Sequence, residues 1–245
     1  MQEAQALELY GIMGAGAAST LAAAGGSGGL FCWIPCGAHL ALTRADAVAA
    51  SEAMPSCRET VLTIAMAAGP VIPAAPGLKF TSVDELCRFL SPNATDLTTS
   101  LEYLAGLTEV HLKAAWRKEA FLADIDAPEL QALSNQSVQS PADLPAAESV
   151  SLLVERLINE RRAWYIGQIC NPLQVSAVSM TLASLSPTRI VFDAAFLVGS
   201  DDQEEFYRYV EHRTRSYEDR LEFHYDGPWP PHHFGLVHSS GVDQP

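Results

Sequence analysis

Three prolines in four positions limit this chain more than any other feature, because they exclude a helix across the sequence GPWPP. Pro228, Pro230 and Pro231 have no backbone N–H donor, and the proline ring holds φ near about −65°. The segment must therefore be extended or polyproline-like, and it holds Trp229 in place at low entropic cost.

The residues before these prolines alternate between apolar and polar types, which predicts a strand over Asp219–Tyr225. Asp226-Gly227 then predicts a turn. Two interpretations of Trp229 and Phe234 stay open. They either anchor the end of the chain on the domain core, which we favour, or form an exposed recognition surface.

The second half of the chain has a simple predicted order of elements. Apolar residues recur at helical spacing across Val150–Ile169. Strands Val175–Ala183 and Arg189–Val198 are joined as a hairpin, and Asp201-Asp202 begins a second helix. With the strand described above, this order predicts a sheet that two helices cover on one face.

The first half mixes short strands with helices. Strands are predicted at Leu7–Ile12, Leu30–Pro35, Ala38–Thr43, Pro70–Pro73 and Glu109–Arg117, with Glu109 on a solvent-facing side. Helices are predicted from Thr43 toward Ala68 with a break near Pro55, from a capping box at Ser82 and Glu85 to Leu90, and over Thr95–Ala105. The Gly/Ala-rich tract Gly14–Gly29 is predicted to be a loop.

An acidic segment with three prolines, Asp124–Ser149, predicts a domain boundary. We therefore expect an α+β protein with two domains. The N-terminal α+β domain spans 1–123, an acidic proline-containing linker spans 124–149, and the C-terminal domain spans 150–245 and ends in the Pro/Trp tail.

Composition excludes several classes of partner. The 245 residues carry a net charge of −14, which repels nucleic acid backbones. No run of about 18 apolar residues predicts a membrane span, and the N-terminus does not resemble a secretory signal. Five cysteines, an odd number, then predict reduced and mostly buried thiols in a cytoplasmic protein.

Several motifs suggest chemistry but lack the partners that the chemistry needs. The sequence GAGAAS at 14–19 resembles a phosphate-binding loop, and a nucleotide- or small-molecule-binding enzyme that uses this loop is our alternative function. However, glycines at 25–29 interrupt the helix, and no acid that could bind a ribose lies between Glu8 and Asp46. We predict no catalytic, cofactor-binding or metal-binding residues, and we interpret Cys32 and Cys36 as core thiols.

Four segments together resemble the gas vesicle protein F/L family (GvpF/GvpL). They are LELYGI at 7–12, GPVIPAAPGLKF at 69–80, TRIVFDAAFLV at 188–198, and GPWPP at 227–231. The resemblance implies a ferredoxin-like C-terminal domain with an antiparallel sheet. It also implies a non-enzymatic protein of the cytoplasm and gas vesicle that binds the hydrophobic shell protein GvpA and other accessory proteins.

The resemblance directs attention to two groups of residues as interaction or structural anchors: Gly227, Pro228, Trp229, Pro230, Pro231 and Phe234 near the C-terminus, and Pro70 and Pro73 in the central segment. Relatives usually carry Arg-Phe-Gly where this chain has Ala75, Pro76 and Gly77. An acidic protein with an apolar cleft could shield an aggregation-prone shell subunit before assembly.

Overall fold

The structure is a computed structural model that describes residues 6–23, 32–45, 58–125, 144–184, 189–239 and 241–242. The chain forms two compact units, each of which is described by itself. Unit 1 consists of Met1–Glu109, Gly199–Asp201 and Pro228–Pro245, and unit 2 consists of Val110–Val198 and Asp202–Gly227. Most of the expected linker, 126–143, lies outside the described residues, so the linker stays a prediction that limited proteolysis can test.

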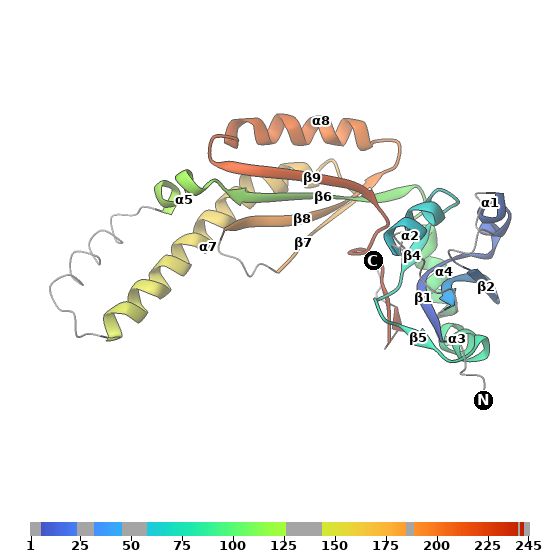
Figure 1. Cartoon of the computed structure of the whole chain (residues 1–245). Helices are drawn as coiled ribbons and strands as arrows, with labels where there is room; N and C mark the ends of the chain where they lie inside the picture. The colour runs from blue at the N-terminus through green and yellow to red at the C-terminus, as the bar shows by residue number, and fades with distance from the viewer. Residues whose placement is uncertain are drawn as a thin grey trace, which may run out of the picture. The chain divides into compact units, whose positions relative to one another are not determined.

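An antiparallel sheet forms the centre of unit 1, with the strand order β2-β3-β1-β4 and with β5 paired to β1 (Figure 1). β1 and β3 pair from Leu7 opposite Ala45 to Gly14 opposite His39. β2 pairs with β3 from Cys32 opposite Thr43 to Cys36 opposite His39, so these two strands form a hairpin, and β4 lies at an edge of the sheet. The strands are β1 (Leu7–Gly14), β2 (Cys32–Cys36), β3 (His39–Ala45), β4 (Val71–Pro73) and β5 (Lys79–Phe80).

β1 is buried on both faces, because the five consecutive residues Leu9–Met13 are all buried. Gly11 allows a close approach at this point. A Cβ atom on Gly11 would lie 2.9 Å from the Ile72 carbonyl oxygen and 2.9 Å from the Leu62 side chain. β1 is therefore the strand around which the rest of unit 1 packs.

Short helical segments accompany this sheet in the part of unit 1 that the structure describes, and both α2 and α4 contact β1 and β4. They are η1 (Ala15–Ala17), α1 (Ala18–Ala23), α2 (Arg58–Met66), α3 (Val83–Leu90), η2 (Ser91–Asn93) and α4 (Ala94–Tyr103). The prediction of a loop at Gly14–Gly29 is wrong over 15–23, because its alanines favour helix. The remainder of that tract and the predicted break near Pro55 lie outside the described residues.

The predicted cap at the start of α3 is present. Ser82 Oγ accepts a hydrogen bond from the Glu85 backbone N at 3.2 Å. The Glu85 carboxylate accepts from the backbone N and from Oγ1 of Thr81, at 2.7 and 2.6 Å. Each side chain therefore satisfies a donor at the helix N-terminus, although Glu85 reaches one residue further back than a capping box requires.

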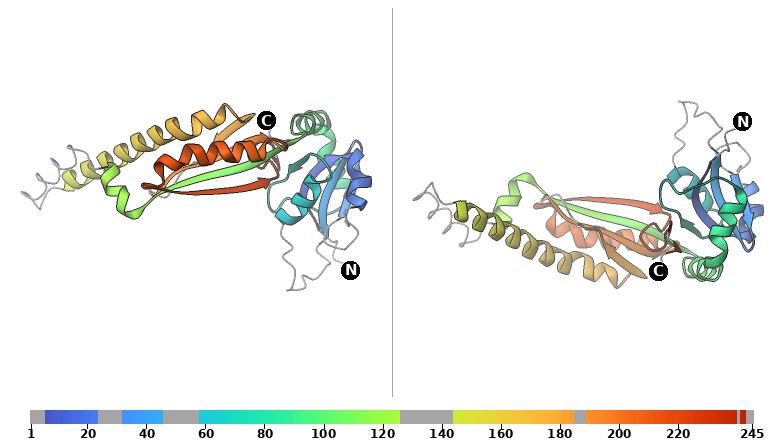
Figure 2. Two further views of the ribbon diagram at one scale, coloured as in Figure 1. Left: turned by 90° about the horizontal axis from the view of Figure 1, so that it is seen from above. Right: turned by 90° about the horizontal axis from the view of Figure 1, so that it is seen from below.

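A second antiparallel sheet, in the order β7-β8-β6-β9, forms unit 2. The end of β6 lies beside the starts of β8 and β9, since Trp116 N donates to Arg189 O at 3.0 Å and Arg117 N donates to Arg220 O at 2.8 Å. Figure 2 shows α7 and α8 on one face of this sheet, as the order of elements predicted. The elements are β6 (Leu107–Trp116), α5 (Lys118–Ile125), α7 (Leu144–Gln174), β7 (Ser179–Leu182), β8 (Ile190–Gly199), α8 (Gln203–Thr214), η3 (Arg215–Tyr217) and β9 (Leu221–Trp229).

A buried carboxylate connects α5 to the core of unit 2. Asp124 Oδ2 accepts hydrogen bonds from Trp116 Nε1 at 3.0 Å and from the Tyr165 hydroxyl. Asp124 Oδ1 lies 3.2 Å from Arg220 Nη1. Arg161 Nε donates to the Asp124 carbonyl oxygen at 3.0 Å. Burial, and then the hydrogen bond to Asp124, raises the pKa of Tyr165 well above its ordinary value.

The predicted turn at Asp226-Gly227 is wrong, because β9 continues through these residues to Trp229. Gly227 takes a φ of 133°, a value that suits glycine. Pro228 lies in β9, which is an edge strand of its sheet, and edge strands are where proline occurs in sheets. None of the helices in the described ranges is both long enough and apolar enough to span a lipid bilayer.

Candidate functional site

The segment that follows β9 packs within unit 1. Pro230, Pro231 and Phe234 are buried, whereas Pro228 is exposed. Trp229 is half-buried, and its carbonyl oxygen accepts a hydrogen bond from Thr108 Oγ1 at 3.1 Å. Pro230, Pro231 and Phe234 are therefore the buried part of this segment, and Trp229 stays partly exposed.

A fully buried glutamate fixes the same segment. Glu109 has no exposed surface, and its carboxylate accepts from His233 twice, from the backbone N at 2.8 Å and from Nδ1 at 2.7 Å. Because a carboxylate only accepts, Nδ1 of His233 carries the proton. The expected solvent-facing position of Glu109 is therefore wrong, because the residue is buried. Its partner His233 lies 124 residues away in the sequence, so no local pattern indicates the pair.

The neighbouring His232 is partly buried, and burial lowers its pKa below the ordinary value. Of the four histidines near the C-terminus, His232 and His233 are thus held in unit 1 by packing and by a carboxylate. His224 is an exposed residue of β9 in unit 2.

The central segment lies beside this C-terminal segment. Pro73 is buried and pairs with Gly11 in the sheet. The Ala75 backbone N donates to the Val237 carbonyl oxygen at 2.6 Å, and Ala74 forms a parallel bridge with Val237. Val237 and His238 form β10 (Val237–His238), which pairs with β11 (Gly241–Val242).

Pro70 lies at two cavities of unit 1. One has a volume of about 300 Å³ and is also lined by Pro231. The positions that differ from the usual family pattern, Ala75 and Pro76, lead into a turn at Gly77, whose φ is 79°. The Gly77 backbone N donates to Glu8 Oε1 at 3.4 Å.

The second cavity, of about 390 Å³, is an open and mostly apolar groove that we call the α4 groove. It contains the start of the Gly/Ala tract and one face of α4. Among its lining residues none is Lys or Arg, so a nucleotide phosphate would find no cation there. The lining residues are Gly14, Gly16, Ala17, Ala38, His39, Ala68, Gly69, Pro70, Thr98, Leu101, Glu102 and Ala105.

One hydrogen bond defines the polar part of the α4 groove. His39 Nε2 lies 3.1 Å from Thr98 Oγ1, and Thr98 Oγ1 donates to the Ala94 carbonyl oxygen at 2.9 Å. The hydroxyl proton is thus used, so His39 Nε2–H donates to Thr98 and Nδ1 is the acceptor nitrogen. Burial lowers the pKa of His39, and the imidazole is neutral at pH 7.

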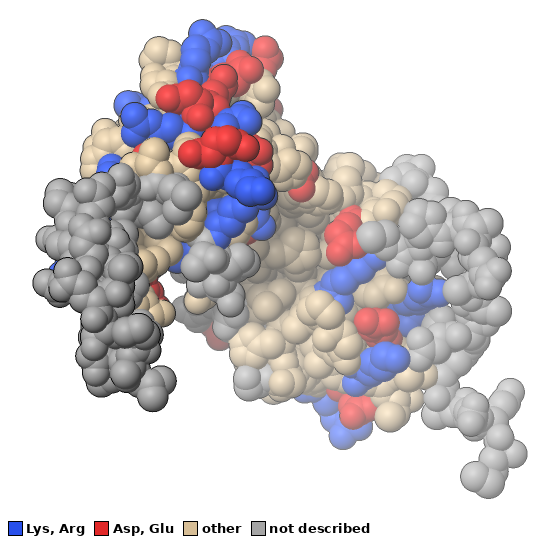
Figure 3. Space-filling model, turned by 60° about the vertical axis from the view of Figure 1, so that its left-hand side comes forward, with Lys and Arg blue, Asp and Glu red and all other residues tan. Residues whose placement is uncertain are grey.

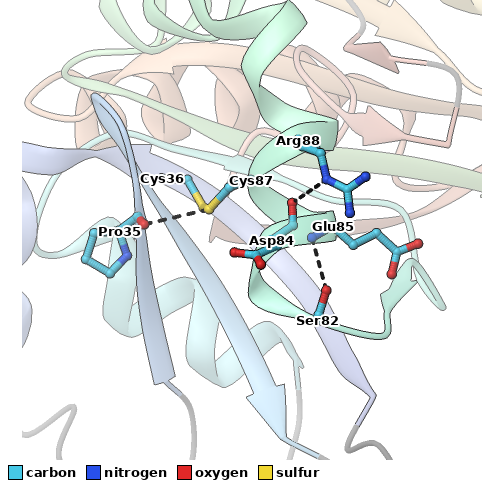
Figure 4. The surroundings of a disulfide bond; sticks show 7 residues. All are labelled: Pro35, Cys36, Ser82, Asp84, Glu85, Cys87 and Arg88. Atoms are coloured by element: carbon cyan, nitrogen blue, oxygen red, sulfur yellow. Dashed lines mark hydrogen bonds between the residues drawn. A yellow bond between two sulfur atoms is a disulfide. The ribbon is translucent and has the colours of Figure 1, made fainter.

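A disulfide joins Cys36, at the end of β2, to Cys87 of α3 (Figure 4). The Pro35 carbonyl oxygen lies 3.7 Å from Cys87 Sγ. The prediction of five reduced and mostly buried thiols is therefore wrong for this pair. Cys32 is free and exposed, and Cys170 is free and buried. Burial raises the pKa of Cys170 to about 12, so its thiol stays protonated at neutral pH.

Charges of both signs are intermixed on the face shown in Figure 3. On the surface of unit 2, oppositely charged side chains pair directly, for example Lys113–Asp193 at 3.3 Å and Arg189–Glu222 at 3.1 Å. That face therefore offers no continuous basic surface for a nucleic acid.

Comparisons with known proteins agree with this architecture. The family model for "Gas vesicle synthesis protein GvpL/GvpF" matches residues 7–235. The crystal structure of GvpF from Anabaena sp. PCC7120 is similar with a TM-score of 0.72 and 22% identity, over 94% of this chain and 97% of that chain. The crystal structure of GvpF from Microcystis aeruginosa is similar with a TM-score of 0.73 and 21% identity, over 94% and 98%. Among curated proteins, none matches the chain significantly.

Proposed function

The chain belongs to the GvpL/GvpF family of gas vesicle synthesis proteins, and we propose that it binds the hydrophobic shell protein GvpA and assists its assembly into gas vesicles. The family match across residues 7–235 carries this proposal, because it includes both units and the buried segment after β9. The family is one of structural and assembly proteins rather than enzymes.

The physical properties of the chain support this role. A net charge of −14 keeps the protein soluble and repels other copies of itself. The α4 groove offers apolar surface to a partner, and shielding of apolar surface is what a shell subunit needs before it is incorporated. We place the protein in the cytoplasm and at the gas vesicle, with other vesicle accessory proteins as further partners.

The same membership supports a ferredoxin-like assignment for unit 2, whose order from α7 onward is helix, strand, strand, helix, strand. The candidate anchors are Gly227, the last residue of unit 2, and Pro228, Trp229, Pro230, Pro231 and Phe234 of unit 1, together with Pro70 and Pro73. Those of unit 1 would hold this unit in its binding-competent form.

Co-expression of the affinity-tagged full chain with GvpA tests the proposal. We expect GvpA to co-purify with the tagged chain and to stay soluble at a level that it does not reach alone. A tagged acidic protein of similar size and charge is the control for non-specific capture. If GvpA co-purifies equally with both, or with neither, the proposed function is wrong.

Titration with ATP and with NAD tests the alternative function of the 14–19 loop. Because the α4 groove has no lining cation, we expect neither compound to change the melting temperature. A rise of several degrees would establish a ligand site in the folded protein and support the enzyme interpretation.

A further inference from the structure

The α4 groove is open because its own residues leave it unfilled. A Cβ atom added to Gly14 or to Gly16 would meet no atom within 4 Å, whereas one added to Gly11 would clash at 2.9 Å. Gly14 has a φ of −69° and a ψ of 146°, a conformation that any residue adopts. Neither packing nor backbone geometry thus requires glycine at position 14, and its effect is to leave space.

One face of α4 forms the wall of this space. Thr98, Leu101 and Glu102 of α4 recur at the spacing of a single helical stripe, and Ala105 follows just after the helix. Leu101 provides apolar surface, and Thr98 is already hydrogen-bonded to His39. Glu102 is exposed, and it is the acidic residue among those lining the groove.

The charge at the groove selects the kind of partner. Its lining includes one carboxylate and a neutral histidine, and no Lys or Arg. A cationic group beside an apolar one would therefore find complementary surroundings, whereas an anionic group would be repelled. The apolar lining with few orienting polar groups suits a protein side chain better than a polar metabolite.

We propose that the α4 groove is a docking site for a large apolar side chain of a partner protein that carries a lysine or arginine next to it. The apolar side chain enters the space beside Gly14 and Gly16, and the cation pairs with Glu102. The inference rests on the proposed function in one respect, since it takes the vesicle shell subunit GvpA as that partner.

Filling the groove tests the apolar half of this proposal. Gly14→Leu and Gly16→Leu each place a side chain in the open space, in the full-length protein. Gly167→Leu on α7 is the matched control, because a Cβ there also meets nothing within 4 Å. We expect both groove variants to melt at or above the wild-type temperature and to bind GvpA at least tenfold more weakly, with wild-type binding by the control.

Reversing the charge tests the other half. Glu102→Lys should weaken binding of GvpA, and Glu102→Gln should remove much of its salt dependence, because screening then has no charge pair to weaken. Glu155→Lys, at an exposed position of α7, is the control for net charge.

The outcomes separate this inference from the proposed function. If wild type fails to bind GvpA, the proposed function is wrong and the groove does not receive that partner. If wild type binds GvpA and the two groove variants bind equally well, the proposed function stands and the docking site is wrong. Loss of binding in the Gly167→Leu control as well would also overturn the docking site.

Discussion

Replacement of Asp124 by alanine should destabilise the protein by about 3–5 kcal/mol, because this one carboxylate holds several groups of unit 2 together. Its side chain is 4% exposed. Trp116 and Tyr165, which donate to it, are both fully buried and would lose their acceptor. Water cannot easily replace the lost partner at such a site.

The magnitude follows from these contacts. A hydrogen bond to a charged acceptor contributes about 1.5–3 kcal/mol, and Asp124 accepts two from buried donors. The ion pair with Arg220 adds less than about 1 kcal/mol, because 51% of the Arg220 side chain is exposed. Removal of the carboxylate also removes its own desolvation cost, which brings the total to about 3–5 kcal/mol.

Urea denaturation followed by tryptophan fluorescence measures this change, and hydrogen exchange in β6 shows whether unit 2 is the part that opens. Asp124→Asn keeps the size and one acceptor and should cost about 1–2 kcal/mol. Asp219→Asn is the control, because Asp219 is 73% exposed and lies 3.7 Å from Arg220. A loss below about 1 kcal/mol for Asp124→Ala would refute this account of unit 2.

Three further predictions concern single side chains. A thiol reagent should label Cys32 in the native protein and leave Cys170 unlabelled, as mass spectrometry can check, because burial raises the pKa of Cys170 to about 12. Burial lowers the pKa of His39 below 6.5, so the unfolded chain binds more protons and stability falls as the pH drops from about 7 to 5. In His39→Gln, the free energy of unfolding, measured by urea denaturation at the two pH values, should fall less than in the wild type. An equal fall in both proteins would contradict this prediction. Phe234→Ala should cost about 3–5 kcal/mol and Trp229→Ala about 2 kcal/mol, since Phe234 is buried and Trp229 is only half-buried, and equal losses in thermal melting would contradict this order.

Features that depend on neighbouring residues were predictable from the sequence. The cap at Ser82, the alternation in β6 and the helical spacing in α7 all depend on residues within a few positions of one another. The order of elements in unit 2 followed from the same local patterns. The helix at 15–23 was missed because glycines in the tract outweighed its alanines in the prediction.

Features that join distant residues could not be predicted in this way. Cys36 and Cys87 are 51 positions apart, and neither has a local pattern that indicates the other. Glu109 occupies a polar position of an alternating strand, which normally faces water. Only the folded chain brings His233 to it, and a buried carboxylate needs such a partner. The α4 groove likewise combines four separate segments of unit 1 that no periodicity relates.

Because Pro228–Pro245 belongs to unit 1, this unit cannot complete its fold during synthesis until long after its first strands have left the ribosome. For example, the Ala75 backbone N donates to the Val237 carbonyl oxygen at 2.6 Å, and this hydrogen bond cannot form before Val237 has been synthesised. At about 5–20 residues per second, translation of the intervening chain takes on the order of ten seconds. Unit 2 is fully synthesised earlier, so the usual order of N-terminal domain first is reversed. A released chain that ends at Gly227 should therefore have a folded unit 2 and a protease-sensitive unit 1.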